Sequence, residues 1–431
     1  MRVTVIGAGL AGVEAAHQLS KRGIKVNLCE MKPQKRSLAH KTDLFAELVC
    51  SNSLKAERLN SAAGLLKAEM RLFDSVTVAA AYETQVPAGG ALAVDRDKFS
   101  SLITKRILQD ENITVITGEV TKIPSGVVII AAGPLMSQDL SRAVGKKIGE
   151  NFLSFYDAAA PIVTKDSIDF NSAFAASRYE RGGEDDYINC PLNKAEYEAF
   201  IKELISAEGA PLHDIDGTPD VYEGCMPVEI MAKRGENTLR FGPMKPVGLV
   251  DPNTGHRPWA VVQLRKENKE GTLFNLVGFQ TNLKFGEQKR VFSMIPALKD
   301  AEFVRYGVMH RNSFINAPEV LNANWSLKTD ENVFFAGQIT GVEGYMESAA
   351  SGILAGINAA NMVLGEQPFI PSNLTMMGAL NAHITDKTSK NYQPQGAAFG
   401  LLPPLDEIIK DKKERYEKLA LRAMREMEKN I

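Results

Sequence analysis

The stretch RVTVIGAGLAGVEAAHQLSKRGIKVNLCE, residues 2–30, decides the fold of this chain. Its apolar start, residues 3–6, predicts a buried strand that runs into Gly7, Gly9 and Gly12. We then expect a helix to about residue 22 and a second strand over residues 25–29 that ends at the acid Glu30. This order of strand, glycine turn, helix, strand and acid is the dinucleotide-binding fingerprint in its required context.

Each part of this fingerprint has a physical role in holding a dinucleotide. Gly7 permits a tight turn, Gly9 lets the backbone approach a pyrophosphate, and Gly12 lets helix and strand pack closely. The helix N-terminus offers unpaired N–H groups and the positive end of its dipole to the phosphates. Glu30 can accept hydrogen bonds from a ribose 2′-OH, which favours an adenosine without a 2′-phosphate. The predicted cofactor residues here are Gly7, Ala8, Gly9, Leu10, Ala11, Gly12 and Glu30.

The composition is that of an ordinary globular protein. The chain has 431 residues, 44% of them hydrophobic and 24% charged, which is enough for two domains. No apolar run is long enough to span a bilayer, and we expect the first one to be the nucleotide strand and not a signal peptide. The four cysteines are widely spaced without a CxxC motif, which predicts no metal site and no disulfide scaffold, and a cytoplasmic protein.

Charge is segregated along the chain although the formal net charge is only −2. Residues 177–230 contain four Lys and Arg against thirteen Asp and Glu, a balance of −9. Residues 231–311 contain fourteen against seven, a balance of +7. A basic segment of this kind can bind a phosphate backbone, but two solvated faces of one domain would give the same pattern.

The hydrophobic pattern divides the chain into three parts. Residues 95–109 predict an amphipathic helix, 113–123 a hairpin and 127–131 a buried strand. Short strands and frequent turns follow, and the apolar strand–helix pattern returns at residue 332. We therefore predict an α/β protein with a Rossmann-type FAD-binding domain of the two-dinucleotide-fold flavoprotein kind, residues 1–155 and 328–431. Residues 156–327 form the predicted insertion, an α+β domain on the substrate side.

The returning unit carries the second part of the predicted cofactor site. A strand over residues 333–336 leads into a glycine-rich turn and a helix of small residues that starts near residue 346. Such a helix can point its N-terminus at the flavin side of the cofactor, although a unit that only packs is the alternative. Flavoproteins commonly have Asp after the glycine that ends this strand. This chain has Gln338 instead, whose amide can contact the ribityl chain. The predicted contacts are Gly337, Gln338, Gly341, Gly344 and Tyr345.

Two of the cysteines lie in settings where a thiol can be exposed and activated. Cys50 and Cys225 are in loop-like stretches with polar neighbours, ELVCSNSLK and EGCMPVE. Cys29 ends an apolar strand and is expected in the core, and Cys190 has no such support. Inert packing remains the alternative for any single cysteine.

Several long and unusual stretches resemble one family, the folate- and FAD-dependent tRNA (uracil-5-)-methyltransferases called TrmFO. The resemblance runs over essentially the whole chain, and the related MnmG (GidA) family shares the nucleotide motif. The most specific stretches are ELVCSNSLK (47–55), FYDAAAPIV (155–163), EGCMPVEIMAKRG (223–235), VGFQTNLKFGEQKRVF (277–292) and AGQITGVEGYMESAASG (336–352).

The resemblance implies a reaction and its partners. FAD is reduced by NAD(P)H, 5,10-methylenetetrahydrofolate supplies the carbon, and C5 of a T-loop uridine in tRNA is methylated to 5-methyluridine. C5 of uracil is a poor nucleophile until a thiolate adds at C6. We assign Cys225 as this nucleophile and Cys50 as the flavin-side thiol, both catalytic. The basic segment becomes the expected tRNA surface, with Lys284, Lys289, Arg290 and Arg311 as candidate contacts.

Several alternatives stay open at this stage. The same chemistry on ribosomal RNA, or an MnmG-like modification of a tRNA wobble uridine, would fit related motifs. A flavin reductase or oxidase without an RNA substrate, or a non-catalytic FAD-bound RNA-binding protein, belongs to a different class. The sequence does not decide between NADH and NADPH, and it leaves the oligomeric state open.

Overall fold

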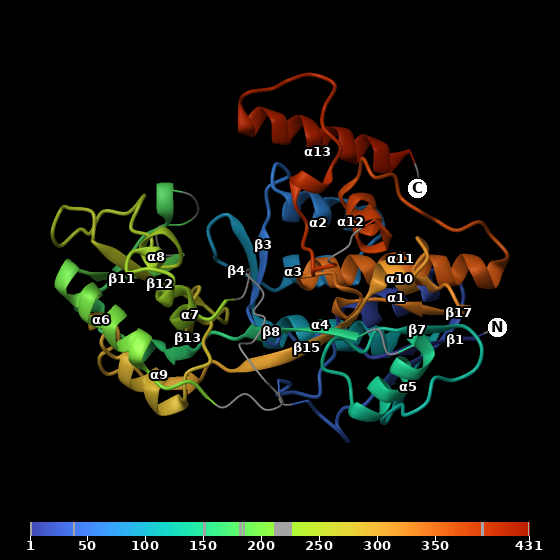
Figure 1. The fold of residues 1–431 in the computed structure, drawn as a ribbon, viewed down its shortest axis with the longest axis horizontal. Helices are drawn as coiled ribbons and strands as arrows, with labels where there is room; N and C mark the ends of the chain where they lie inside the picture. Colours follow the sequence, from blue (N-terminus) through green and yellow to red (C-terminus); the bar gives the residue numbers. More distant parts are fainter. Residues whose placement is uncertain are drawn as a thin grey trace.

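The protein is described from a computed structural model, shown in Figure 1. The structure describes residues 2–37, 39–149, 152–180, 183, 186–210, 226–388, 392–429 and 431. For residues 152–157, 180, 310 and 311 it describes only the backbone.

A six-stranded sheet built around the N-terminal strand forms the centre of one half of the molecule. β1 pairs in parallel with β2 and β7, β7 with β17, and β2 with β6, while β16 is antiparallel to β17. The strands in spatial order are β16 (Ser326–Leu327), β17 (Asp330–Phe335), β7 (Val128–Ile130), β1 (Arg2–Ile6), β2 (Lys25–Glu30) and β6 (Ile113–Thr117). The strands predicted at 3–6, 25–29, 127–131 and 333–336 are confirmed, with ends that differ by at most three residues.

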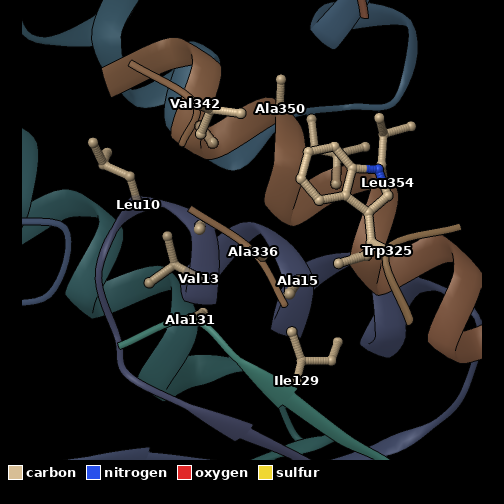
Figure 2. Close-up of a cluster of buried hydrophobic side chains, with 14 of the residues drawn as sticks. Leu10, Val13, Ala15, Ile129, Ala131, Trp325, Ala336, Val342, Ala350 and Leu354 are labelled. Carbon is tan, nitrogen blue, oxygen red and sulfur yellow. The ribbon is translucent and has the colours of Figure 1, made fainter. Parts of the chain in front are cut away.

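Two helices pack tightly beside this sheet, α1 (Leu10–Lys21) and α11 (Tyr345–Leu364). The small residues of α11 serve this contact, because a Cβ on Gly352 would lie 2.7 Å from the Cα of Ala11, and one on Gly356 2.9 Å from the Cα of Ala15. Figure 2 shows the two helices meeting around buried apolar side chains. Gly352 and Gly356 of α11 therefore bring two backbones together, while Tyr345 and Ser348 at the start of the helix line the groove described below.

The second large sheet has a separate hydrophobic core, in the left-hand half of Figure 1. Its paired strands are antiparallel, which suits hairpin connections. In spatial order they are β10 (Phe174–Ala175), β11 (Tyr187–Leu192), β12 (Ala260–Lys266), β13 (Leu273–Leu276), β9 (Ile162–Thr164) and β14 (Phe303–Arg305). The helices beside it are α6 (Lys194–Ser206), α7 (Val228–Lys233), α8 (Thr238–Phe241) and α9 (Phe285–Phe292). All these elements lie within the predicted insertion, whose boundaries stay a prediction.

A two-stranded ribbon, β8 (Phe152–Ala158) paired antiparallel with β15 (Met309–Ile315), runs between the two halves (Figure 1). A small sheet of β3 (Ser53–Ala56), β5 (Ala91–Val94) and β4 (Gln85–Val86) lies nearby. The remaining α-helices are α2 (Ala62–Leu72), α3 (Val76–Glu83), α4 (Arg96–Gln109), α5 (Gln138–Ile148), α10 (Ala317–Val320), α12 (Met376–Thr385) and α13 (Lys412–Glu428). None of the helices in the described ranges is both long and apolar enough to cross a bilayer.

One detail differs from the sequence prediction. The hairpin over residues 113–123 is wrong, because β6 pairs in parallel with β2 and no strand follows it over 118–123. β6 is an edge strand with one exposed side, and a half-exposed strand alternates in the same way as one arm of a hairpin.

Candidate active site

A groove opens at the carboxyl ends of the parallel strands. The chain after β1, β2, β6, β7 and β17 lines it, and the groove holds about 1340 Å³ of space, part of it open to solvent. Ligands of open α/β sheets bind at this edge of the sheet. Among the described residues, no group of three or more His, Cys, Asp and Glu side chains is arranged to hold a metal ion.

The three fingerprint glycines divide into two roles. Gly7 has φ of +99°, and a Cβ there would lie 2.6 Å from the carbonyl oxygen of Ala131. A Cβ on Gly12 would lie 1.8 Å from the carbonyl oxygen of Gly7, so this residue permits close packing of helix and strand. Gly9 has φ of −73° and no atom within 4 Å of its Cβ position, and it lines the groove. Open space in front of a helix N-terminus fits a pyrophosphate.

The carboxylate of Glu30 is held in this groove by two backbone N–H groups. One oxygen accepts a hydrogen bond from the backbone N–H of Ala8 at 2.9 Å and the other from that of Lys32 at 3.0 Å. Glu30 is buried and lines the groove. Each carboxylate oxygen has two lone pairs, so both can still accept a ribose hydroxyl.

The turn after β17 supplies fewer groove residues than the sequence predicts. Gly337 and Gln338 line the groove, and the amide of Gln338 donates to a carboxylate oxygen of Glu343 at 2.8 Å. Gly341 and Gly344 do not line it. A Cβ on Gly341 would collide with the phenol of Tyr392, and one on Gly344 with the carboxylate of Glu347. These two glycines therefore make room for neighbouring side chains.

Cys50 lies in the same groove as the fingerprint, together with Tyr345. The backbone N–H groups of Cys50 and Ser51 donate to the phenol oxygen of Tyr345 at 2.7 and 3.2 Å. The thiol of Cys50 lies 3.5 Å from the carbonyl oxygen of Ala158. Burial raises the pKa of the Tyr345 phenol, so it stays protonated. The structure thus places a half-buried thiol in the groove that the late turn also lines.

An arginine–glutamate pair holds the backbone around this thiol, which we call the Cys50 loop, residues 48–52. Arg96 of α4 donates to the carbonyl oxygens of Leu48 at 2.8 Å and Cys50 at 3.2 Å. The same guanidinium makes two hydrogen bonds to Glu267, at 2.7 and 3.2 Å. The side chain of Glu267 is only 4% exposed. Bidentate pairing of this kind fixes a direction as well as a distance.

Two further arginines from the second sheet reach the same loop. Arg305, the last residue of β14, donates to the carbonyl oxygen of Val49. Arg265 of β12 donates to the hydroxyl of Ser51 at 3.0 Å and to the side-chain oxygen of Asn52 at 2.8 Å. Sequence reasoning missed these arginines, and no local pattern marks them, because their partners lie about 50 to 256 residues away along the chain.

The other cysteines differ in their surroundings. Cys225 lies outside the described residues, so its predicted role stays a prediction; the described chain resumes at Met226. Cys29 and Cys190 are buried, as expected for Cys29, and burial raises the pKa of both thiols. A raised pKa disfavours the reactive thiolate.

Three of the four predicted RNA contacts lie at α9: Lys284 directly precedes the helix, and Lys289 and Arg290 are on it. Lys284 forms an ion pair with Glu208 at 2.5 Å, and Arg290 pairs with Glu203 at 2.5 Å and Glu287 at 2.8 Å. Lys289 is exposed, and no described residue forms an ion pair with it. Arg311 lies on β15, where only the backbone is described. Two of the three cations at α9, Lys284 and Arg290, are therefore already paired with carboxylates.

Comparisons with known proteins agree with this architecture. The chain matches the family "Glucose inhibited division protein A" over residues 2–367. GidA of Aquifex aeolicus superposes with a TM-score of 0.70 at 16% identity, over 99% of this chain and 73% of that one.

Relatives much nearer in sequence share one name. The methylenetetrahydrofolate--tRNA-(uracil-5-)-methyltransferase TrmFO of Acetivibrio thermocellus is 59% identical, over 98% of this chain and 97% of that protein. The protein of the same name from Anoxybacillus flavithermus is 57% identical, over 98% of each chain. With the fingerprint, the GidA-like fold and this identity over its whole length, the chain belongs to the TrmFO family of methylenetetrahydrofolate--tRNA-(uracil-5-)-methyltransferases.

Proposed function

We propose that this protein methylates C5 of the T-loop uridine of tRNA, with 5,10-methylenetetrahydrofolate as carbon donor and NAD(P)H as reductant. The observation that carries the proposal is that Cys50 lines the same groove as Gly9 and Glu30. The transfer of a carbon from the flavin to a base requires a thiol close to the dinucleotide site, and Cys50 meets this requirement. Family membership, over essentially the whole chain, supplies the reaction class.

The residues of the groove fit FAD. Gly9 leaves open space for the pyrophosphate, Glu30 can accept the ribose hydroxyls, and Gln338 lines the groove, where its side chain would contact the ribityl chain. FAD, when bound, would supply redox chemistry and a carrier for the one-carbon unit. The methylene carbon needs two further electrons to become a methyl group, and NAD(P)H is the proposed source of these electrons.

The thiols have separate proposed roles. Cys225 adds to C6 of the uracil, which makes C5 nucleophilic, and leaves again when the C5 proton is lost. Cys50, held beside the groove by Arg96 and Arg305, acts on the flavin side, where it shields the carbon unit from water. The target base must leave its loop to meet this site.

The decisive experiment follows the product. Purified protein is incubated with undermodified tRNA, NADPH and labelled methylenetetrahydrofolate, and the nucleosides are analysed. Labelled 5-methyluridine from the T-loop supports the proposal. Label only in ribosomal RNA, offered in a parallel reaction, would move the substrate to that RNA, and flavin turnover without any labelled nucleoside would make the protein a reductase or oxidase.

A second experiment separates the thiols. RNA containing 5-fluorouracil traps a covalent complex when a thiol attacks C6. Cys50→Ala should still form this complex, and Cys225→Ala should not. The opposite pattern would exchange the two roles, and trapping by both variants would show that neither thiol is the nucleophile.

A further inference from the structure

Three aromatic rings beside α9 form a stacked column that ends at the protein surface. The ring centroids of Phe285 and Tyr306 lie 4.8 Å apart with 14° between the ring planes. Those of Tyr306 and Phe303 lie 5.6 Å apart at 13°. These spacings and near-parallel planes are those of offset stacking. We call these three rings the aromatic column.

The inner end of the column is fixed in the core of the second sheet. Phe303 contacts Phe292 at 6.4 Å, and Phe292 contacts Phe279 at 5.6 Å. Both Phe292 and Phe279 are fully buried. The column is therefore supported from below, so its outer ring is held in a fixed orientation without a ligand.

The outer end of the column is exposed. Phe285 is 54% exposed although one face of its ring is covered by Tyr306. A further ring could therefore stack on its other face, at the outer end of the aromatic column. A flat, apolar ligand ring placed there would extend the same spacing by one step.

The side chain of Lys289 projects from the same side of α9 as Phe285, because the two residues are four apart on this helix. The described residues give Lys289 no ion-pair partner, in contrast to the paired Lys284 and Arg290. An aromatic face with a lysine next to it is the usual combination for an unpaired nucleotide, because the ring stacks on the base and the lysine holds the phosphate.

The column is also connected to the Cys50 loop. Tyr306 directly follows Arg305, whose guanidinium donates to the carbonyl oxygen of Val49, the residue before Cys50. A base that leaves an RNA loop loses its stacking partners, and its neighbours lose one as well. A platform near the thiol can replace that lost stacking for a neighbouring base.

We propose that the outer face of Phe285 is a stacking platform for an unpaired base of the substrate RNA, next to the extruded uridine, and that Lys289 holds the adjacent phosphate. This rests on the proposed function for the identity of the ligand. The platform binds without reading the base, since every base offers a π-face. It therefore contributes to RNA affinity and to holding the loop open, and has no part in the flavin chemistry.

The test uses an unmodified T-arm hairpin RNA and three variants of the full-length protein. Phe285→Ala removes the platform and Phe285→Trp keeps it. Phe170→Ala serves as the control, because it removes another exposed phenylalanine, 45% exposed, that is not part of the aromatic column. We expect the Kd for the hairpin to rise about 5- to 20-fold in Phe285→Ala. Phe285→Trp and Phe170→Ala should stay near wild type, as should FAD content and flavin reduction by NADPH in all three.

Three outcomes would overturn the proposal while leaving the methylation reaction intact. The first is an unchanged Kd for RNA in Phe285→Ala. The second is a raised KM for methylenetetrahydrofolate with normal RNA binding, which would assign the ring to the folate. The third is an equal loss in Phe285→Trp, which would indicate a merely structural role. A wild-type protein that methylates no RNA would instead refute the proposed function, so the two failures are distinguishable.

Discussion

Gly9 and Gly12 are three residues apart, and a side chain at each should have a different effect. At Gly9 it should prevent cofactor binding, and at Gly12 it should destabilise the fold. A Cβ on Gly9 meets nothing within 4 Å, and its φ of −73° suits any residue. Gly9→Val should therefore fold normally but fill the space in which the pyrophosphate would lie. A Cβ on Gly12 would lie 1.8 Å from the carbonyl oxygen of Gly7, so Gly12→Ala should damage the fold itself.

The two effects differ in size and in kind. Losing two charge-assisted hydrogen bonds to phosphate, at about 1.5–3 kcal/mol each, should weaken FAD binding in Gly9→Val by roughly 10²- to 10⁴-fold. Its free energy of unfolding without cofactor should change by no more than about 1 kcal/mol, the cost of a poor helix cap. Gly12→Ala needs a backbone shift to relieve its collision, and overpacking of this kind costs about 3 kcal/mol or more.

Flavin absorbance per protein and thermal unfolding, with and without added FAD, measure both effects. Gly9→Val should be colourless, with the Tm of the wild-type apoprotein and no rise when FAD is added. Gly12→Ala should have a lower Tm before any cofactor is added, by about 5 °C. The reasoning is refuted by a yellow Gly9→Val protein with a wild-type flavin spectrum, or by a Gly12→Ala apoprotein as stable as the wild type.

Three further predictions follow from buried and exposed charges. Glu267→Gln breaks a buried ion pair and should lower kcat for methylation while FAD content stays normal; equal kcat would exclude a positioning role. Burial raises the pKa of Glu69 from 4.5 to about 8, so the contribution of this residue to the free energy of unfolding decreases as the pH rises through this range. In Glu69→Gln this decrease should be smaller, which urea titrations at several pH values measure. Lys289→Glu should reduce the slope of log K against log salt for tRNA by about one, whereas Arg290→Gln, whose cation is already paired, should change it less.

Much of the first half of the molecule is predictable because its signals are local. A continuous apolar run, a glycine and a helix period follow one another within about 30 residues, so β1, α1 and β2 can be recognised from neighbouring positions alone. The strand at Asp330–Phe335 and the helix after it are predictable for the same reason.

Helix α9 shows where local signals mislead. Gly286 among charged residues is typical of a turn, yet Gln288, Val291 and Phe292 are buried and hold the segment as a helix. The burial of these three side chains depends on the second sheet, which the local sequence does not contain. The local sequence also hides the pairing of Lys284 with Glu208 and of Arg290 with Glu203, because these two acids lie just after and on α6, in the acidic segment.

The groove as a whole depends on contacts between distant parts of the chain. The fingerprint predicts where FAD binds. The position of Cys50, however, depends on Arg96, which is hydrogen-bonded to Glu267 just after β12, and on Arg305. Arg96 belongs to helix α4, whereas Arg265 and Arg305 belong to the second sheet, so the loop keeps its shape only while the two halves hold their relative position. A shift between the halves would move the thiol relative to the groove. This dependence explains why the loop is bound through backbone carbonyls by arginines, whose several donors can fix a segment in direction as well as distance.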